Sequence, residues 1–130
     1  MLKNLSPIIS GELLRALDET PSGAWIAMVS RAHHDVEGIA APESTIEDVA
    51  AALLAVTPLD PDAPIVAEGE GEPGDAVFAV AGLAADAEGR RFKMLAVSEL
   101  AFGALLTECH VAVVVDDPVP FGFLLCKGRC

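Results

Sequence analysis

The chain is poor in basic residues and cysteines, and these two scarcities exclude whole classes of protein. Eight Lys and Arg residues stand against 20 Asp and Glu residues, so the formal net charge is -12. A surface this acidic repels phosphate backbones and anionic lipids. The three cysteines are an odd number without CxxC spacing, which argues against a disulfide framework and a zinc knuckle. We therefore expect a cytoplasmic protein that binds neither nucleic acid nor membranes.

Long apolar runs are missing as well. The most apolar stretches, such as residues 76–85, fall short of the roughly 18–20 residues that a membrane-spanning helix needs. Pro7 and Glu12 interrupt the N-terminal segment and no small-residue cleavage site follows it, so we expect no export signal. Apolar material for a core is nevertheless ample, because 52% of the 130 residues are hydrophobic. We expect residues 1–130 to form one domain.

Helical and strand patterns alternate along the chain. Helices are predicted at residues 10–17, 45–55, 75–86 and 98–108, the second with a capping box of Ser44 and Glu47. Strands are predicted at residues 25–29, 65–67, 92–97, 111–115 and 121–126. Residues 30–43 are predicted to form a long loop at the carboxyl end of the first strand, where α/β sheets hold ligands. The pattern indicates a three-layer α/β/α domain with a largely parallel sheet.

Motifs with an explicit mechanism are absent from the sequence. There is no Walker loop, no GxGxxG turn, no GxSxG elbow and no HExxH helix. The glycines of residues 69–74 lie among Glu and Asp, which favours a solvated turn over a phosphate cradle. We expect no cofactor.

His33, His34 and Asp35, with Glu37 nearby, are the one concentration of side chains that can bind a metal or move protons near pH 7. Adjacent side chains of an extended segment point to opposite sides, so at most one histidine faces a given pocket. A metal site, a pocket-facing imidazole and plain surface polarity are the three interpretations. Because the spaced ligands of structural zinc sites are missing, we expect no metal.

Several blocks of the sequence carry a resemblance to a known family. They are Met1-Leu2-Lys3-Asn4, Pro7, Glu12-Leu13-Leu14, Leu17 and Gly23 near the start, residues 48–64 in the middle, and Phe121-Gly122, Leu124-Leu125 and Lys127-Gly128 at the end. In these blocks, and in their order, the chain resembles the ribose pyranase / fucose mutarotase family (RbsD/FucU). Its members are small cytoplasmic proteins that interconvert the ring forms of sugars. The resemblance implies the fold of that family.

The functional positions of the family are where this chain departs from it. The first turn of the family reads His-Gly-Asp with a catalytic histidine, and here it reads Ser22-Gly23-Ala24. The pocket aspartate of the family falls on Ser30 or, with one inserted residue, on Arg31. A Tyr-Gly-Asn or Tyr-Ala-Asn motif near the end becomes Phe121 and a glycine, without the asparagine. The resemblance implies Ser22, Ser30, Arg31 and Phe121 as substrate-binding positions.

These replacements leave two functions open. Mutarotation needs one group that takes the proton of the anomeric hydroxyl and another that protonates the ring oxygen. Serine and phenylalanine cannot do this near neutral pH, so His33, His34 and Asp35 are the candidate catalytic residues. The first function is a divergent sugar mutarotase-like isomerase for a reducing monosaccharide such as fucose or ribose. The second is a catalytically degenerate protein on the same fold, which binds a small molecule or has a specialised non-sugar role.

Self-association is a further expectation from the resemblance. Family members form ring-like homo-oligomers, decamers in several bacterial cases, with pockets completed by the neighbouring subunit. The resemblance therefore implies a homo-oligomer here as well. We also expect Ser22, Ser30 or Arg31, His33 and Phe121 to line one cleft.

Overall fold

The structure of the chain is a computed structural model that describes residues 11–30, 38–41, 45–60, 62–69, 75–115 and 121–128. Helices and strands alternate through these residues, as the sequence pattern predicts. The helices are α1 (Gly11–Glu19), α2 (Ile46–Val56), α3 (Asp75–Glu88) and α4 (Glu99–Leu106). The strands are β1 (Trp25–Ser30), β2 (Ile39–Ala41), β3 (Ile65–Glu68), β4 (Met94–Val97), β5 (Val111–Val115) and β6 (Gly122–Cys126).

The strands form one sheet in the order β2-β5-β1-β6-β3-β4. β6 runs antiparallel to its neighbours β1 and β3, while the remaining neighbouring pairs are parallel. The prediction of a largely parallel sheet is confirmed. Because β6 is inserted beside β1, the carboxyl end of the chain returns to the amino end of the first strand.

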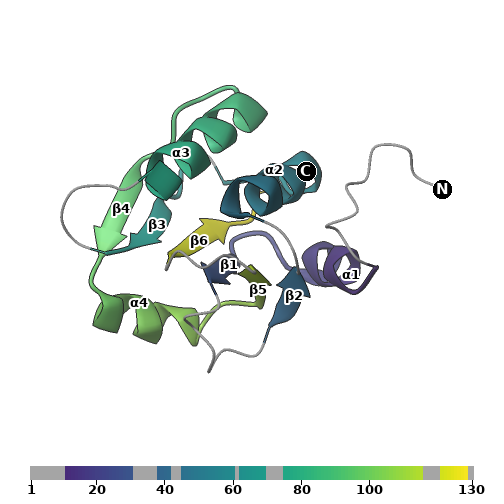
Figure 1. The fold of residues 1–130 in the computed structure, drawn as a ribbon. Coiled ribbons are helices and arrows are strands. Elements are labelled where there is room, and N and C mark those ends of the chain that lie inside the picture. The colour runs from purple at the N-terminus through teal and green to yellow at the C-terminus, as the bar shows by residue number, and fades with distance from the viewer. Residues whose placement is uncertain are drawn as a thin grey trace.

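Side chains alternate between the two faces of the sheet, because successive residues of a strand point to opposite sides. In β1, Ile26 and Met28 join the larger core with α1, α2 and α3. Ala27 and Val29 join the smaller core, where Phe102 of α4 is fully buried. The described helices therefore cover both faces of the sheet, with α4 alone on its side (Figure 1). The predicted three-layer architecture is confirmed.

Two helices begin at hydroxyl caps. The Ser98 Oγ accepts a hydrogen bond from the Ala101 N–H at 3.1 Å, so α4 starts where the sequence predicts. In α2 the cap is Thr45, whose Oγ1 accepts from the Asp48 N–H at 3.3 Å. The prediction of a capping box with Ser44 is therefore wrong by one residue, because the N–H three positions after Thr45 reaches the threonine hydroxyl.

One other sequence prediction needs correction. The predicted loop of residues 30–43 contains β2, whose three residues pair in parallel with β5 at the edge of the sheet. A strand this short is invisible to a periodicity argument. Gly38, just before β2, allows the chain to come close to β5, since a Cβ at Gly38 would lie 2.7 Å from the Ala112 carbonyl oxygen. His110, just before β5, is exposed, and its backbone N–H donates to the Trp25 carbonyl at 2.8 Å.

No helix in the described ranges combines the length and the hydropathy that crossing a bilayer requires.

Candidate functional site

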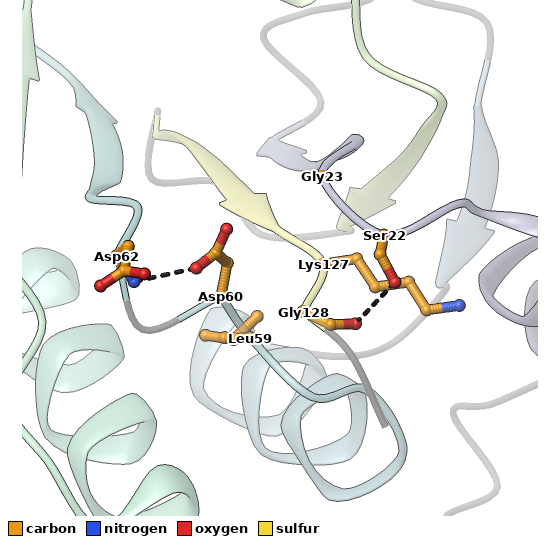
Figure 2. Close-up of a pocket in the computed structure, with 7 residues that line it drawn as sticks. All are labelled: Ser22, Gly23, Leu59, Asp60, Asp62, Lys127 and Gly128. Atoms are coloured by element: carbon orange, nitrogen blue, oxygen red, sulfur yellow. Dashed lines mark hydrogen bonds between the residues drawn. The ribbon is translucent and has the colours of Figure 1, made fainter.

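A cavity of about 520 Å³ lies at the amino end of β1. Three distant segments meet there: the turn before β1, the connection from α2 to β3, and the residues after β6 (Figure 2). The residues that line it are Ser22, Gly23, Leu59, Asp60, Asp62, Lys127 and Gly128. The cavity therefore brings together residues that carry a hydroxyl, two carboxylates and an ammonium group.

Backbone hydrogen bonds hold the three segments together. The Gly23 N–H donates to the Lys127 carbonyl at 2.8 Å, and the Lys127 N–H donates to the Ala24 carbonyl at 2.9 Å. The Asp60 N–H donates to the Cys126 carbonyl at 3.0 Å. The two bonds of Lys127 extend the ladder of β1 and β6 beyond the strand ends, and the Asp60 bond ties the connection after α2 to the end of β6. The polar side chains of the cavity therefore project from a backbone that the sheet itself fixes.

Glycines make this close approach possible. Gly23 has a φ of 90°, in the left-handed region that favours glycine. A Cβ at Gly128 would lie 2.5 Å from the Leu59 carbonyl oxygen and 2.8 Å from the Asp60 nitrogen. Both contacts are with backbone, which cannot rotate away. A side chain at Gly128 would therefore push apart two walls of the cavity.

The side chains of the cavity have distinct tasks. The Ser22 hydroxyl donates to the Gly128 carbonyl at 3.3 Å, and Asp60 Oδ1 accepts from the Asp62 N–H at 2.9 Å. Lys127 Nζ donates to the Leu17 carbonyl at 2.7 Å, where it neutralises the negative end of α1. The ammonium group thus joins the cavity to a helix end, while the carboxylates give the cavity its acceptor oxygens.

Cys126 lies next to this site without offering a nucleophile. Burial and the negative charge of Asp60 raise the pKa of the Cys126 thiol above its ordinary value. Burial likewise raises the pKa of the Cys109 thiol. Because the thiolate is the reactive form, both thiols stay protonated and unreactive near neutral pH. Cys126 is buried, as expected for a small apolar residue of the last strand.

Ser30 and Phe121 meet at the other end of β1. The Ser30 N–H donates to the Phe121 carbonyl at 3.1 Å, and the Phe121 N–H donates to the Ser30 Oγ at 3.2 Å. Both residues are buried, with exposed fractions of 1% and 6%. The Phe121 ring lies against Phe123, with the ring centroids 6.0 Å apart. In the described residues, the carboxyl end of β1 is therefore covered by two hydrogen bonds between Ser30 and Phe121 and by two phenyl rings.

Ser22 does not share a cleft with Ser30 and Phe121 within one chain. Ser22 precedes β1 and Ser30 ends it, and at about 3.3 Å per residue the six-residue strand alone spans roughly 16 Å. Arg31, His33, His34 and Asp35 lie outside the described residues. The expected single cleft is therefore not formed by Ser22 and the Ser30–Phe121 pair of the same copy.

No motif in the sequence marks the carboxylates of the cavity as functional. Asp60, Asp62 and Lys127 belong to blocks that resemble the family, and no role follows from the resemblance for them. The one local signal is the proline-rich connection of residues 58–64, which is typical of a rigid turn. Within the part of the chain that the structure describes, no group of three His, Cys, Asp or Glu side chains could hold a metal ion.

Comparisons with known proteins identify the fold. No protein-family model matches the sequence, and no curated protein matches it either. Among solved structures, a protein described as a candidate sugar-binding protein has a TM-score of 0.89 at 20% identity, covering 100% of this chain and 97% of that one. The fucose mutarotase of Streptococcus pneumoniae in complex with L-fucose has a TM-score of 0.82 at 17% identity, covering 99% of each chain.

A third structure is RbsD of Bacillus subtilis complexed with D-ribose, with a TM-score of 0.75 at 14% identity, covering 100% of this chain and 99% of that one. At these identities the likeness establishes the fold. The resemblance inferred from the sequence is confirmed to that extent, since one chain path is shared over the whole length.

Proposed function

Because the chain has the RbsD/FucU fold, we propose that it is a divergent sugar mutarotase-like isomerase of the cytoplasm, acting on a reducing monosaccharide such as fucose or ribose. The observation that carries the proposal is the polar cavity beside Ser22, the position where the resemblance places the catalytic histidine of the family. Its volume of about 520 Å³ is in the range typical of small-molecule sites.

The lining of the cavity fits the hydrogen-bonding needs of a sugar. A monosaccharide exposes several hydroxyl groups, each of which loses water on binding and needs a partner in the site. The carboxylates of Asp60 and Asp62 accept hydrogen bonds from such hydroxyls, and the Ser22 hydroxyl can donate or accept.

The proposed reaction opens and recloses the sugar ring. A base takes the proton of the anomeric hydroxyl, the bond between the anomeric carbon and the ring oxygen breaks, and the ring oxygen receives a proton from an acid. The anomeric carbon becomes an open-chain carbonyl. Rotation and reclosure return both protons and give the other ring or anomeric form. No cofactor takes part in these proton transfers.

We assign proton transfer to His33, His34 and Asp35, because an imidazole changes its charge near neutral pH. These residues follow β1 at its carboxyl end, whereas the cavity lies at its amino end. A complete site therefore combines the cavity of one copy with the carboxyl end of β1 from a neighbouring copy, where Ser30, Arg31 and Phe121 belong. The proposal accordingly includes a homo-oligomer with shared sites, such as a decameric ring.

The binding-only function has one observation in its favour. The Ser30 hydroxyl stands at the position of the family's pocket aspartate. It accepts a hydrogen bond from the backbone N–H of Phe121, so it serves the backbone and not a ligand. Phe121 itself lacks the phenolic hydroxyl of the family. This end of the site thus has lost two polar groups, which agrees with a protein that retains sugar binding without catalysis.

Magnetisation exchange in NMR separates the two functions. Saturation of one ring form of ribose or fucose is transferred to the other forms faster when the protein catalyses their exchange. We expect acceleration by the native chain, its loss in a His33→Ala/His34→Ala variant, and a weaker affinity for the sugar in Asp60→Asn. Asp86→Asn, an exposed carboxylate on α3, is the matched control and keeps full activity.

Each other outcome has a definite meaning. Sugar-induced chemical-shift changes without accelerated exchange would replace the isomerase by the binding-only function. Absence of both for the two sugars would contradict the sugar proposal altogether.

A further inference from the structure

The edge of the sheet at β4 is open and apolar. β4 pairs with β3 on one side, and no described strand lies on its other side (Figure 1). The strand reads Met-Leu-Ala-Val, with Leu95 43% exposed and Ala96 exposed as well. Natural edge strands usually carry a charge, a proline or a bulge that prevents pairing with another chain. β4 itself has none of the charged or proline residues that serve this purpose.

The hydrogen bonds to β3 show which backbone groups face the open side. The Ile65 N–H donates to the Lys93 carbonyl at 2.9 Å, and the Gly69 N–H donates to the Val97 carbonyl at 2.8 Å. Along a strand, the N–H and C=O of alternate residues point to opposite sides. Residues 93, 95 and 97 therefore face β3. The N–H and C=O groups of Met94 and Ala96 face outward.

We propose that β4 pairs in antiparallel orientation with β4 of a second copy of this chain, across a two-fold axis. Residues with outward groups must stand opposite one another, which places Met94 opposite the partner's Ala96 and Ala96 opposite the partner's Met94. This register uses all four outward groups of each strand. Leu95 then stands opposite the partner's Leu95, in the closely spaced type of pair where side chains pack best.

The charges at the two ends of β4 complement one another in this register. Arg90, Arg91 and Lys93 precede the apolar strand and are exposed, and Glu99 follows it and is exposed. In this antiparallel arrangement Arg91, before the amino end of β4, lies toward the carboxyl end of the partner's β4, where the partner's Glu99 begins α4. Two copies that each carry a net charge of -12 repel one another overall. The chain has eight Lys and Arg residues in all, and three of them gather at this one edge, where they reduce that repulsion.

The pairing deepens the proposed function, since it supplies one contact of the proposed homo-oligomer. It does not depend on sugar binding. A two-fold contact of this kind unites copies in pairs, and a second, different contact is needed to build a ring from such pairs.

A proline at the outward-facing position tests the pairing. Ala96→Pro removes one outward N–H and leaves the hydrogen bonds to β3, so edge geometry tolerates it. In light scattering coupled to size exclusion, we expect the native mass to be an even multiple of the 13.4 kDa chain and the variant mass to be half of it. Leu95→Lys is the second variant, because it leaves the backbone unchanged and places like charges opposite one another.

A matched control separates strand pairing from nonspecific association through exposed hydrophobic side chains. Leu100 on α4 is 87% exposed and is the most exposed large hydrophobic side chain in the described residues, but it lies outside the strand. Leu100→Lys is expected to leave the mass unchanged. Unaltered mass in both β4 variants, or a lower mass in Leu100→Lys instead, would overturn the proposal.

Amide exchange and charge reversal examine the register itself. In the native assembly the amides of Met94 and Ala96 should be protected from exchange with deuterium. In Leu95→Lys the Met94 amide should become exposed, while the amides of residues 95 and 97, which face β3, should stay protected. Arg91→Glu and Glu99→Arg each bring like charges together where the ends of the two paired strands meet, so each alone should weaken pairing. An equimolar mixture should form mixed pairs, and its failure to do so would refute this register.

The failure of this pairing can be told apart from that of the sugar isomerase. A native chain that is monomeric at all concentrations overturns the pairing, and one whose Met94 and Ala96 amides exchange freely does so too. The NMR exchange assay on the same sample reports the isomerase independently.

Discussion

The two ends of β1 are built for different purposes. At the carboxyl end, Ser30 and Phe121 exchange two hydrogen bonds and are almost completely buried. At the amino end, Ser22 is exposed and lines a cavity with two carboxylates. Ligands of α/β proteins are usually held at the carboxyl ends of parallel strands. In the described part of this chain, the polar cavity is at the amino end, because the antiparallel β6 brings residues 127 and 128 there.

The largest effect is expected where the backbone walls of the cavity touch. Gly128→Ala places a methyl group against the Leu59 carbonyl and the Asp60 nitrogen, and overpacking against rigid backbone costs about 3 kcal/mol. Denaturation by urea should therefore show a large loss of unfolding free energy. Gly103→Ala in α4 is the control, since its Cβ meets nothing within 4 Å and should stabilise the helix by about 0.5–1 kcal/mol. Equal stability of the two variants would show that the walls can move apart.

The next effect distinguishes the two serines. Ser30→Ala leaves the buried Phe121 N–H without its acceptor, which costs about 1–3 kcal/mol. Ser22→Ala removes an exposed hydroxyl and should change the unfolding free energy by less than about 0.5 kcal/mol. The same urea titration measures both. If Ser22→Ala were the more destabilising change, the contrast between the buried carboxyl end of β1 and its exposed amino end would be wrong.

A smaller effect is expected at Lys127. Replacing Lys127 by Met keeps the long apolar stem but removes the ammonium group from the Leu17 carbonyl at the end of α1. Loss of a cation at a helix carboxyl end costs about 0.3–1 kcal/mol. Thermal unfolding should show a modest decrease in Tm that shrinks at high salt. A salt-independent decrease would indicate lost packing instead of lost charge.

The smallest effect concerns the Cys126 thiol. Burial and Asp60 raise its pKa in the folded chain, so the folded state holds this proton more tightly than the unfolded state. The stabilisation from this proton is present below the unfolded pKa and is lost as the pH rises through the folded pKa. Asp60→Asn should lower the pKa of the thiol, and alkylation of Cys126 in a Cys109→Ala/Cys130→Ala background should then begin at lower pH. An unchanged alkylation profile would show that Asp60 exerts no charge effect there.

Much of the fold could be predicted because strong apolar runs end at clear turn residues. β5 spans Val111–Val115 as predicted, and α4 begins after the Ser98 cap as predicted. β2 was missed because three residues show no period, and its pairing depends on the close approach at Gly38.

The cavity could not be predicted in the same way. Its walls come from residues 22–23, 59–62 and 127–128, which meet only because β6 pairs antiparallel with β1. No local pattern in the sequence indicates that pairing. Ser30 and Phe121 were both named from the resemblance as substrate-binding positions, but no pattern in the sequence predicts the two hydrogen bonds that join them.

The most direct test of the account is to map the amides that respond to sugar. Titration of the labelled chain with fucose or ribose should shift the resonances of Gly23, Asp60, Asp62 and Gly128 at the amino end of β1. Saturable shifts at these four amides are the expected result. Shifts that avoid them while appearing elsewhere, or no shifts at saturating sugar, would contradict the assignment of this cavity as a sugar site.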